Sequence, residues 1–408
     1  MLIFDKSFLE SLNPSEAALL DNFFSSCITP LFFIETLADL EKEVHRGRTA
    51  EDVVGSIALK TPDMESHVSP HHASLLFSEL LDGHEIEMNA KIRMSGGTHV
   101  QLNNGQGMVY TMTPEEEAFL RWQRREFLDL ERQIAKRWRR SVTGIDHSAT
   151  YALFNNLYGS FRKPRDLKDA KLLADTLIDL FKEEISMRLG MSLLQISPAD
   201  QERVLRRWSD KGKPPIREFA PYFSYMYSVE LFFYLSIGAD LISRVRPAKK
   251  ADNKVDIAYL YYLPFCSVFV SNDNLHERVV PLFLGDNQTF VRGQSLKTDL
   301  AKVDAYYDSL PDDVKNKPLY TFAPYPPSHE SFLVADLWDK HTPDWRKEQA
   351  DKKKLTPELQ QALVDLANKL SKESQPVGSG VRPPDVKDLM FIHTSRQIIP
   401  KKGKWKRV

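Results

Sequence analysis

The chain has 408 residues, of which 42% are hydrophobic and 11% aromatic, and this composition excludes a disordered or fibrous protein. Its 55 Lys and Arg residues balance 56 Asp and Glu residues, so any nucleic-acid surface must be a local patch. The two cysteines, Cys27 and Cys266, exclude a disulfide scaffold. With no readable secretory signal and no uninterrupted apolar run of ~20 residues, we expect a cytoplasmic protein without a membrane partner.

The first 45 residues predict a short strand followed by two helices. Residues 2–4 form an apolar run, and Asp5 follows it directly. Residues 13–16 combine an N-cap asparagine, a proline and an acid at the third helical position, which indicates a helix toward Phe24. Thr29 and Pro30 open a second helix, in which Glu35 borders the apolar face.

Residues 46–228 are expected to form an inserted, mainly helical domain. Gly96-Gly97 and Asn103-Asn104-Gly105 are typical of tight hairpin turns. A helix should then begin at Pro114, and further helices are expected at 166–190 and 198–209.

Residues 229–310 should return to the first unit. We expect a buried aromatic helix to about Val245, a short helix carrying Asp256, and strands at 266–271 and 287–291. Asp273 lies in the loop after the first of these strands. Residues 311–408 are expected to be a C-terminal extension, and its basic tail, 401–407, would lie outside the core.

Two acids follow apolar strands, and this position carries chemical meaning. Open α/β sheets place their ligand sites beyond the carboxyl ends of the strands, so Asp5 and Asp273 would meet there if their strands were neighbours. Gathered carboxylates repel one another, and a hard divalent cation with oxygen ligands is the usual way to hold them together. Two of the acids also have simpler interpretations: Asp5 could be a turn former or a cap, and Glu35 could lie at the solvent boundary of its helix and pair with a neighbouring base. Asp252 competes with Asp256, which is favoured by its spacing to Asp273.

The pattern resembles the PIN nuclease family over about residues 1–45 and 230–300. The resemblance rests on Leu2-Ile3-Phe4-Asp5, on Pro30 to Leu37 with Glu35, and on Asp256 to Asp273 with its Ser271-Asn272-Asp273 ending. It implies an α/β fold, an α/β/α sandwich with a parallel sheet, interrupted by the insertion. It also implies a Mg²⁺- or Mn²⁺-dependent endoribonuclease, with Asp5, Glu35, Asp256 and Asp273 as metal ligands and catalytic residues.

The resemblance also suggests a prokaryotic toxin or defence role. The expected partner is single-stranded or structured RNA, and the chain could also form a homo-oligomer or bind an inhibitor protein. Two rival hypotheses stay open. One is a non-catalytic RNA- or protein-binding module on a PIN-like scaffold. The other is a structure-specific DNA nuclease.

Other polar residues leave alternatives open. Glu230, within an aromatic helix, could join the metal cluster or pair with Arg244 or Arg246. His67, His71 and His72 have partial metal-ligand spacing, but the intervening Pro70 favours a surface loop. The basic and aromatic stretches 121–125 and 136–140 either contact nucleic acid or form helix faces whose tryptophans enter the core. The basic tail leaves the same choice between nucleic-acid contact and solubility.

Overall fold

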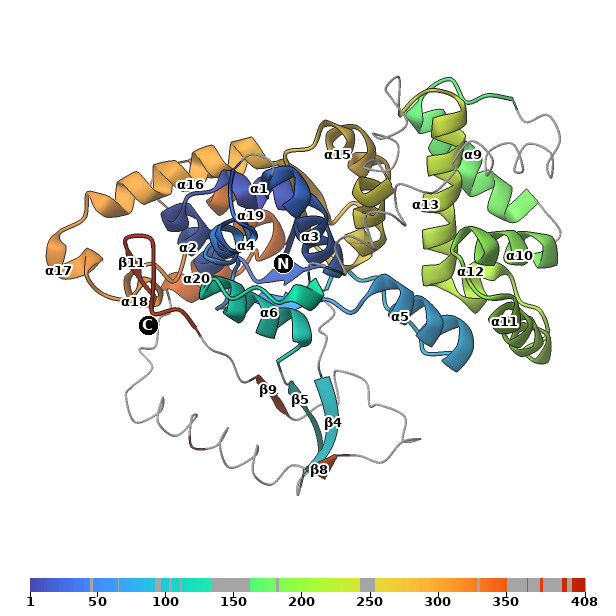
Figure 1. The fold of residues 1–408 in the computed structure, drawn as a ribbon, viewed down its shortest axis with the longest axis horizontal. Helices are drawn as coiled ribbons and strands as arrows, with labels where there is room; N and C mark the ends of the chain where they lie inside the picture. The colour runs from blue at the N-terminus through green and yellow to red at the C-terminus, as the bar shows by residue number, and fades with distance from the viewer. Residues whose placement is uncertain are drawn as a thin grey trace.

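The computed structural model describes residues 1–44, 47–64, 66–91, 97–102, 105–110, 112–131, 133, 162–180, 183–242, 254–328, 331–350, 365, 375–376, 391–394 and 398–407. These residues form an α/β unit, a helical lobe beside it, and a small separate sheet (Figure 1).

A five-stranded parallel sheet is the centre of the α/β unit. Its strands lie in the order β3-β2-β1-β6-β7, with bounds β1 Leu2–Phe4, β2 Ser26–Ile28, β3 Ser66–Val68, β6 Val268–Ser271 and β7 Thr289–Arg292. Strands β1 and β6 pair in register from Leu2 with Val268 to Phe4 with Val270. The α/β class and the strands expected at both ends of the chain are therefore confirmed.

Helices cover both faces of this sheet, because successive strand side chains point in opposite directions. Leu2 and Phe4 belong to one hydrophobic core, whereas Ile3, between them, belongs to the other. The first core is closed by α1 (Lys6–Ser11), α2 (Pro14–Phe23), α16 (Gly293–Asp308) and α19 (Leu333–His341). The second is closed by the aromatic helix α13 (Pro221–Gly238) and the 3-10 segment Tyr259–Phe265.

The two N-terminal helix starts agree with the sequence-based expectation. The Asn13 side chain accepts hydrogen bonds from the backbone N–H groups of Ser15 and Glu16, and the Glu16 carboxylate accepts the Asn13 N–H, completing a capping box. Helix α3 (Pro30–Val44) begins at the expected proline and carries Glu35.

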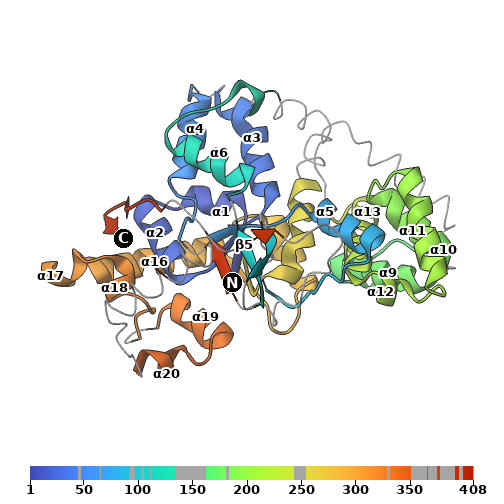
Figure 2. The ribbon, with the colours of Figure 1, turned by 90° about the horizontal axis from the view of Figure 1, so that it is seen from below.

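The expected boundary at residue 45 is wrong, because part of the segment 46–228 completes the α/β unit. Strand β3 lies at the edge of the parallel sheet, and α4 (Ala50–Ala58) and α6 (Pro114–Gln123) pack with α3 (Figure 2). Thr113 caps α6 as expected, but this helix ends at Gln123. The expected strand pair is also present: β4 (Gly97–Leu102) pairs antiparallel with β5 (Gly105–Tyr110), from Gly97 with Tyr110 to Leu102 with Gly105. Flanking strands β8 (Gln375–Pro376) and β9 (Phe391–Thr394) complete the small sheet.

The helical lobe consists of α9 to α13 together with a short helical arm. Its remaining bounds are α5 His72–Phe77, η1 Ser78–Asp82, α9 Leu167–Leu180, α10 Glu183–Leu193, α11 Pro198–Asp210 and α12 Ile216–Phe219. One helix was expected at 166–190, and two are found, while Ser197 caps α11 as expected. Glu79 ties the arm to α13, because its carboxylate accepts the N–H groups of Tyr222 at 3.0 Å and Phe223 at 2.7 Å. The expected buried aromatic helix is confirmed in α13, although it ends at Gly238.

The remaining helices pack around the α/β unit. They are α15 Asn274–Val279, η3 Val280–Leu282, α17 Asp312–Lys315, α18 Leu319–Phe322 and α20 Trp345–Ala350. Within the described residues, no helix combines the length and the apolar character needed to cross a membrane.

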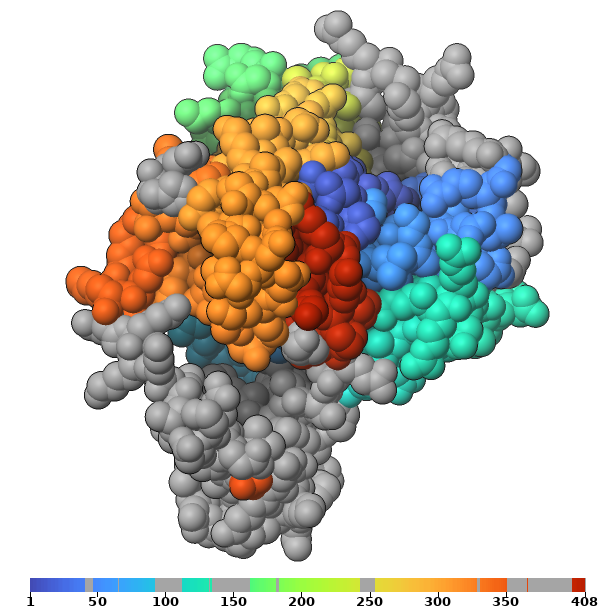
Figure 3. Space-filling view, turned by 90° about the vertical axis from the view of Figure 1, so that its left-hand side faces the viewer, coloured from blue at the N-terminus to red at the C-terminus, as the bar shows by residue number. Residues whose placement is uncertain are grey.

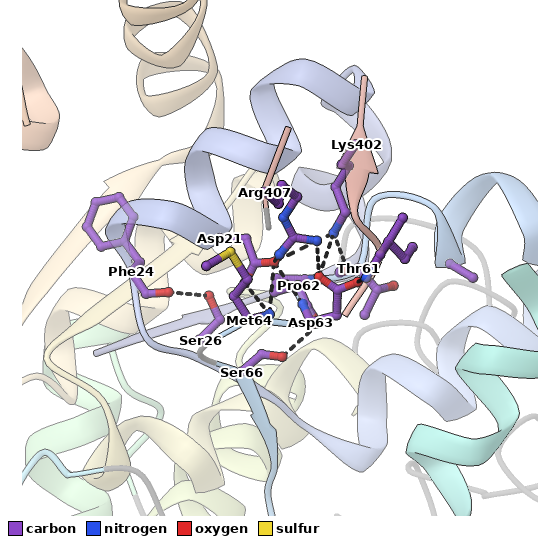
Figure 4. A network of polar contacts seen from close by, with 12 residues as sticks. Asp21, Phe24, Ser26, Thr61, Pro62, Asp63, Met64, Ser66, Lys402 and Arg407 are labelled. Carbon is purple, nitrogen blue, oxygen red and sulfur yellow. Dashed lines mark hydrogen bonds and ion pairs between the residues drawn. The ribbon is translucent and has the colours of Figure 1, made fainter. Parts of the chain in front are cut away.

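The basic tail was expected outside the core, and this expectation is wrong. Strands β10 (Lys401–Lys402) and β11 (Trp405–Lys406) form a small hairpin that lies between α16 and the N-terminal segment (Figure 3). The Arg407 side chain is fully buried and bonds to Asp21 and Asp63. Lys402 Nζ donates to the carbonyl oxygen of Thr61 at 2.7 Å and lies 3.4 Å from Asp63 Oδ1 (Figure 4). Two buried cations thus face the buried Asp21 and the partly buried Asp63, which explains why a basic segment enters the core.

Candidate functional site at the carboxyl ends of β1 and β6

The centre of the sheet contains a topological switch point. From β1 the chain continues to β2 on one side, whereas β6 continues to β7 on the other, and β1 and β6 are neighbours. In open α/β sheets this arrangement leaves a crevice beyond the carboxyl ends of the two central strands, where ligands bind. Asp5 follows β1, and Ser271 is the last residue of β6.

Asp5 is buried and held by several donors. It caps α1 by accepting the Phe8 N–H at 2.9 Å, so the simpler interpretation of this residue as a cap is correct. Ser7 Oγ and Ser271 Oγ donate to Asp5 Oδ2 at 2.7 and 2.6 Å. Burial by itself would raise the pKa of Asp5, but His276 and the two hydroxyls outweigh it and lower that pKa, so this carboxylate is ionised.

Hydrogen-bond counting determines the charge of His276. Ser271 uses its single hydrogen on Asp5, so its oxygen can only accept from the Asp273 N–H at 2.9 Å and from His276 Nδ1 at 2.7 Å. His276 Nε2 lies 2.8 Å from the carbonyl oxygen of Asp256, which also accepts only. Both ring nitrogens therefore carry hydrogen, and His276 is an imidazolium.

The electrostatic surroundings of His276 agree with this assignment. Burial opposes the charge, but Asp5 and Asp256 outweigh burial and raise the pKa of His276 to about 9. The distance from His276 Nδ1 to Asp5 Oδ2 is 3.6 Å, which is long for a hydrogen bond. Ser271 therefore bridges the two charges.

Glu35 projects from α3 toward the same region. Tyr259 donates its hydroxyl to Glu35 Oε2 at 2.9 Å. Burial raises the pKa of Glu35 to about 8, and the negative charges of Asp256 and Asp5 contribute, whereas Lys6 opposes the rise. Glu35 is thus mostly protonated at neutral pH in the absence of an added cation.

Asp256 is half-buried and is the third acid of this region, since its charge acts on both Glu35 and His276. Its competitor Asp252 lies outside the described residues. Lys6 is the nearby cation, and its Nζ lies 2.7 Å from Asp39 Oδ2 and 3.3 Å from Glu10 Oε1.

Asp273 lies directly after β6, as expected, but its carboxylate is the N-cap of helix α15. Asp273 Oδ1 accepts the N–H groups of Leu275 at 2.5 Å and His276 at 3.4 Å and so caps α15. Arg292, at the end of β7, donates to the Asp273 carbonyl oxygen at 3.0 Å and to Asn274 Oδ1 at 2.7 Å. The structure therefore groups Asp5, Glu35 and Asp256 electrostatically, with Asp273 beside them as a cap.

The donor chemistry suits Mg²⁺ or Mn²⁺, because carboxylate oxygens are the ligands that these ions prefer. The raised pKa of Glu35 also indicates negative charge that a cation would compensate. However, no three His, Cys, Asp or Glu side chains among the described residues are grouped closely enough to hold one metal ion. A shared ion would therefore require side-chain movement at this site.

Glu230 does not join this cluster, and its expected arginine partners lie outside the described residues. Its buried Oε1 accepts from Lys254 Nζ and from the Tyr261 hydroxyl. Glu230 is therefore a structural ion-pair residue between α13 and the segment that leads to Asp256.

The histidines expected in a surface loop are placed differently. His67 lies in β3, and His71 caps α5. The His72 ring packs against the Tyr261 ring, and the distance from His72 Nδ1 to the Tyr262 hydroxyl oxygen is 3.2 Å. Burial lowers the pKa of His72 to about 3. His72 thus forms part of the packing between α5 and the segment Tyr259–Phe265.

The first basic stretch does not offer its tryptophan to nucleic acid. Trp122 is fully buried, and its Nε1 donates to Glu131, which also pairs with Arg121. The interpretation that its tryptophan enters the core is confirmed. The second stretch, 136–140, lies outside the described residues.

Sequence reasoning missed three residues of the site: His276, Tyr259 and Lys6. The signal for His276 was its position three residues after Asp273, on the first turn of a helix at a strand end. Tyr259 stands three residues after Asp256, and Lys6 directly follows Asp5, but neither pattern distinguishes a site residue from an ordinary one.

Comparison with protein-family models, curated proteins and solved structures gives no match for this chain.

Proposed function

We propose that this chain is a divalent-metal-dependent endoribonuclease of PIN type that hydrolyses phosphodiester bonds in RNA. One observation carries the proposal: burial, together with the negative charges of Asp256 and Asp5 at the switch point, raises the pKa of Glu35 to about 8. Three acids gathered beyond the carboxyl ends of two central strands favour a site built for a cation.

The chain's own residues would prepare this site. Asp5, Glu35, Asp256 and Asp273 are the proposed ligands. Ser271 and Ser7 orient the Asp5 carboxylate, and Tyr259 orients that of Glu35. A bound Mg²⁺ or Mn²⁺ would supply a water of lowered pKa and offset the charge on the departing oxygen. Glu35 must lose its proton when a cation binds, so binding at neutral pH should release protons.

The test is a double substitution, Asp5→Asn with Asp273→Asn. This variant should lose Mn²⁺-stimulated cleavage of single-stranded RNA and retain a cooperative thermal melt. The matched control is the exposed acid Asp286, changed to Asn, which should leave cleavage intact. Equal cleavage by the double variant and the parent would refute the assignment.

A non-catalytic module that binds RNA or protein is the second candidate, and His276 favours it. An imidazolium bonded to Ser271 already places positive charge among the acids. Such a module would bind RNA, or a protein partner, without metal-dependent turnover.

A DNA nuclease would instead cut single-stranded or flap DNA faster than RNA of matched sequence.

The toxin or defence role implied by the resemblance is a cellular property. Induced expression of the parent should then arrest growth, whereas the Asp5→Asn, Asp273→Asn variant should not. Arrest by both proteins would remove this role from the proposal.

A further inference from the structure

Two lysines that are distant in the sequence converge on the end of helix α1. Lys60 Nζ donates to the carbonyl oxygen of Glu10 at 2.7 Å, and Lys297 Nζ donates to that of Ser11. Lys60 lies just after the end of α4, and Lys297 lies in α16; these two helices flank the N-terminal segment in Figure 3. Two ammonium groups are thus bound to the carbonyls of consecutive residues.

Neighbouring charges of both signs act on Lys60. Burial lowers the pKa of Lys60, and Lys297 and Arg48 lower it further, against the opposing charges of Glu10 and Glu16. Lys60 and Lys297 nevertheless place two ammonium groups side by side, and a local pair of cations attracts a phosphate oxyanion.

Helix capping explains only part of this arrangement. Lysines near a helix end do bind its last carbonyls. However, an ammonium group has three hydrogens, and each carbonyl bond described here uses one. Both lysines are only half-buried, so further donor hydrogens can reach an oxyanion from solvent.

The length of helix α1 separates Lys60 and Lys297 from Asp5. Helix α1 starts immediately after Asp5 and ends at Ser11. Its six residues span ~9 Å at 1.5 Å per residue. A ligand that reaches from the acids to these lysines must therefore be a chain carrying more than one phosphate.

We propose that Lys60 and Lys297 form a phosphate-binding surface that holds the backbone of a single-stranded RNA beside the Asp5 site. This inference rests on the proposed function for its choice of RNA. It assigns the substrate as an oligonucleotide rather than a small phosphodiester.

The test measures binding of a fluorescent single-stranded RNA in EDTA at increasing KCl, so that no catalysis is involved. The double variant Lys60→Gln, Lys297→Gln should reduce the slope of log affinity against log salt by about 1.4, or ~0.7 for each lost phosphate contact. Lys60→Arg with Lys297→Arg keeps both charges and should retain the parent slope. Thermal melts of both variants report any loss of α1 stability separately.

The matched control removes two exposed lysines from the helical lobe, Lys168→Gln with Lys211→Gln, and should leave the slope unchanged. The proposal is overturned if the Lys60, Lys297 variant behaves like this control, or if the parent shows no salt-dependent RNA binding. Failure of the proposed function looks different: the parent then binds RNA with the expected slope but does not cleave it when Mn²⁺ is added.

Discussion

Ser271 and Asp5 stand 266 positions apart, yet the Ser271 hydroxyl donates to Asp5 Oδ2 at 2.6 Å. This hydrogen bond joins the ends of β6 and β1. The Ser271 hydroxyl oxygen also lies 2.7 Å from His276 Nδ1. A single hydroxyl therefore connects the two halves of the site and separates a carboxylate from an imidazolium.

Ser271→Ala should uncouple these two charges. It leaves the buried His276 Nδ1–H and the Asp273 N–H without this acceptor, so we expect a loss of about 1–3 kcal/mol in unfolding free energy. The His276 pKa, followed by NMR titration of its ring protons, should fall from its raised value because the link to Asp5 is lost.

Ser7→Ala is the matched control for this prediction. Ser7 Oγ donates to the same Asp5 oxygen at 2.7 Å but has no described contact with His276. We expect a smaller effect on the His276 pKa. Equal shifts in the two variants would show that Ser271 has no bridging role.

Stability should fall as the pH rises above neutrality in metal-free buffer. His276 has a folded pKa of about 9 against an ordinary 6.5, so its contribution is complete below 6.5 and is lost as the pH rises through 9. Glu35 has a folded pKa of about 8 against 4.5, so it also favours folding less as the pH rises through that interval. Asp5 acts oppositely, because its lowered pKa contributes stability above 3.8 that is lost in acid.

Urea unfolding across this pH range measures the effect. Glu35→Gln should make the fall in unfolding free energy with rising pH smaller by about 1–3 kcal/mol, because the raised pKa of Glu35 is removed. The effect is limited to this size because solvent partly screens the half-buried carboxyl group. Mg²⁺ or Mn²⁺ should restore stability to the parent at alkaline pH. A flat profile for the parent would contradict the charges assigned to Glu35 and His276.

Gly293→Ala should disturb the loop that carries Asp273. A Cβ atom at Gly293 would lie 2.7 Å from Asn272 Oδ1 and 2.8 Å from a ring carbon of Phe8. We expect a destabilisation of about 1–3 kcal/mol from this overpacking, measured by thermal melting. Gly285→Ala is the control, since its Cβ would meet its nearest neighbour at 3.6 Å. If both variants melt alike, the close packing at Gly293 is not important for stability.

Arg407→Ala should destabilise the α/β unit by about 3–5 kcal/mol, because it leaves the buried Asp21 and the partly buried Asp63 with less compensating charge. Adding Asp21→Asn should recover part of this loss in a double-mutant cycle of urea unfolding. The exposed neighbour Lys406, changed to Ala, should have little effect. An Arg407→Ala variant as stable as Lys406→Ala would mean that the tail is not anchored by its charges.

Local patterns in the sequence were sufficient for several elements of the α/β unit, although they missed α1 (Lys6–Ser11) and β2 (Ser26–Ile28). The capping box at Asn13, the proline at position 30 and the apolar runs before Asp5 and Asp273 each depend on neighbouring residues only, so they predicted the helices and strands correctly. The boundary at residue 45 failed because the three-residue strand β3 is too short to show a periodic pattern.

The chain's own sequence determined that apolar strands end in acids and that an acid-bearing helix, α3, follows, because strand, cap and helix signals act over a few residues. Only the tertiary structure decided that β1 pairs with β6 and that His276 supplies a positive charge among these acids. It also decided that Arg407 is buried against Asp21. Burial and the pairing of distant charges depend on the whole packed chain, and no local pattern encodes them.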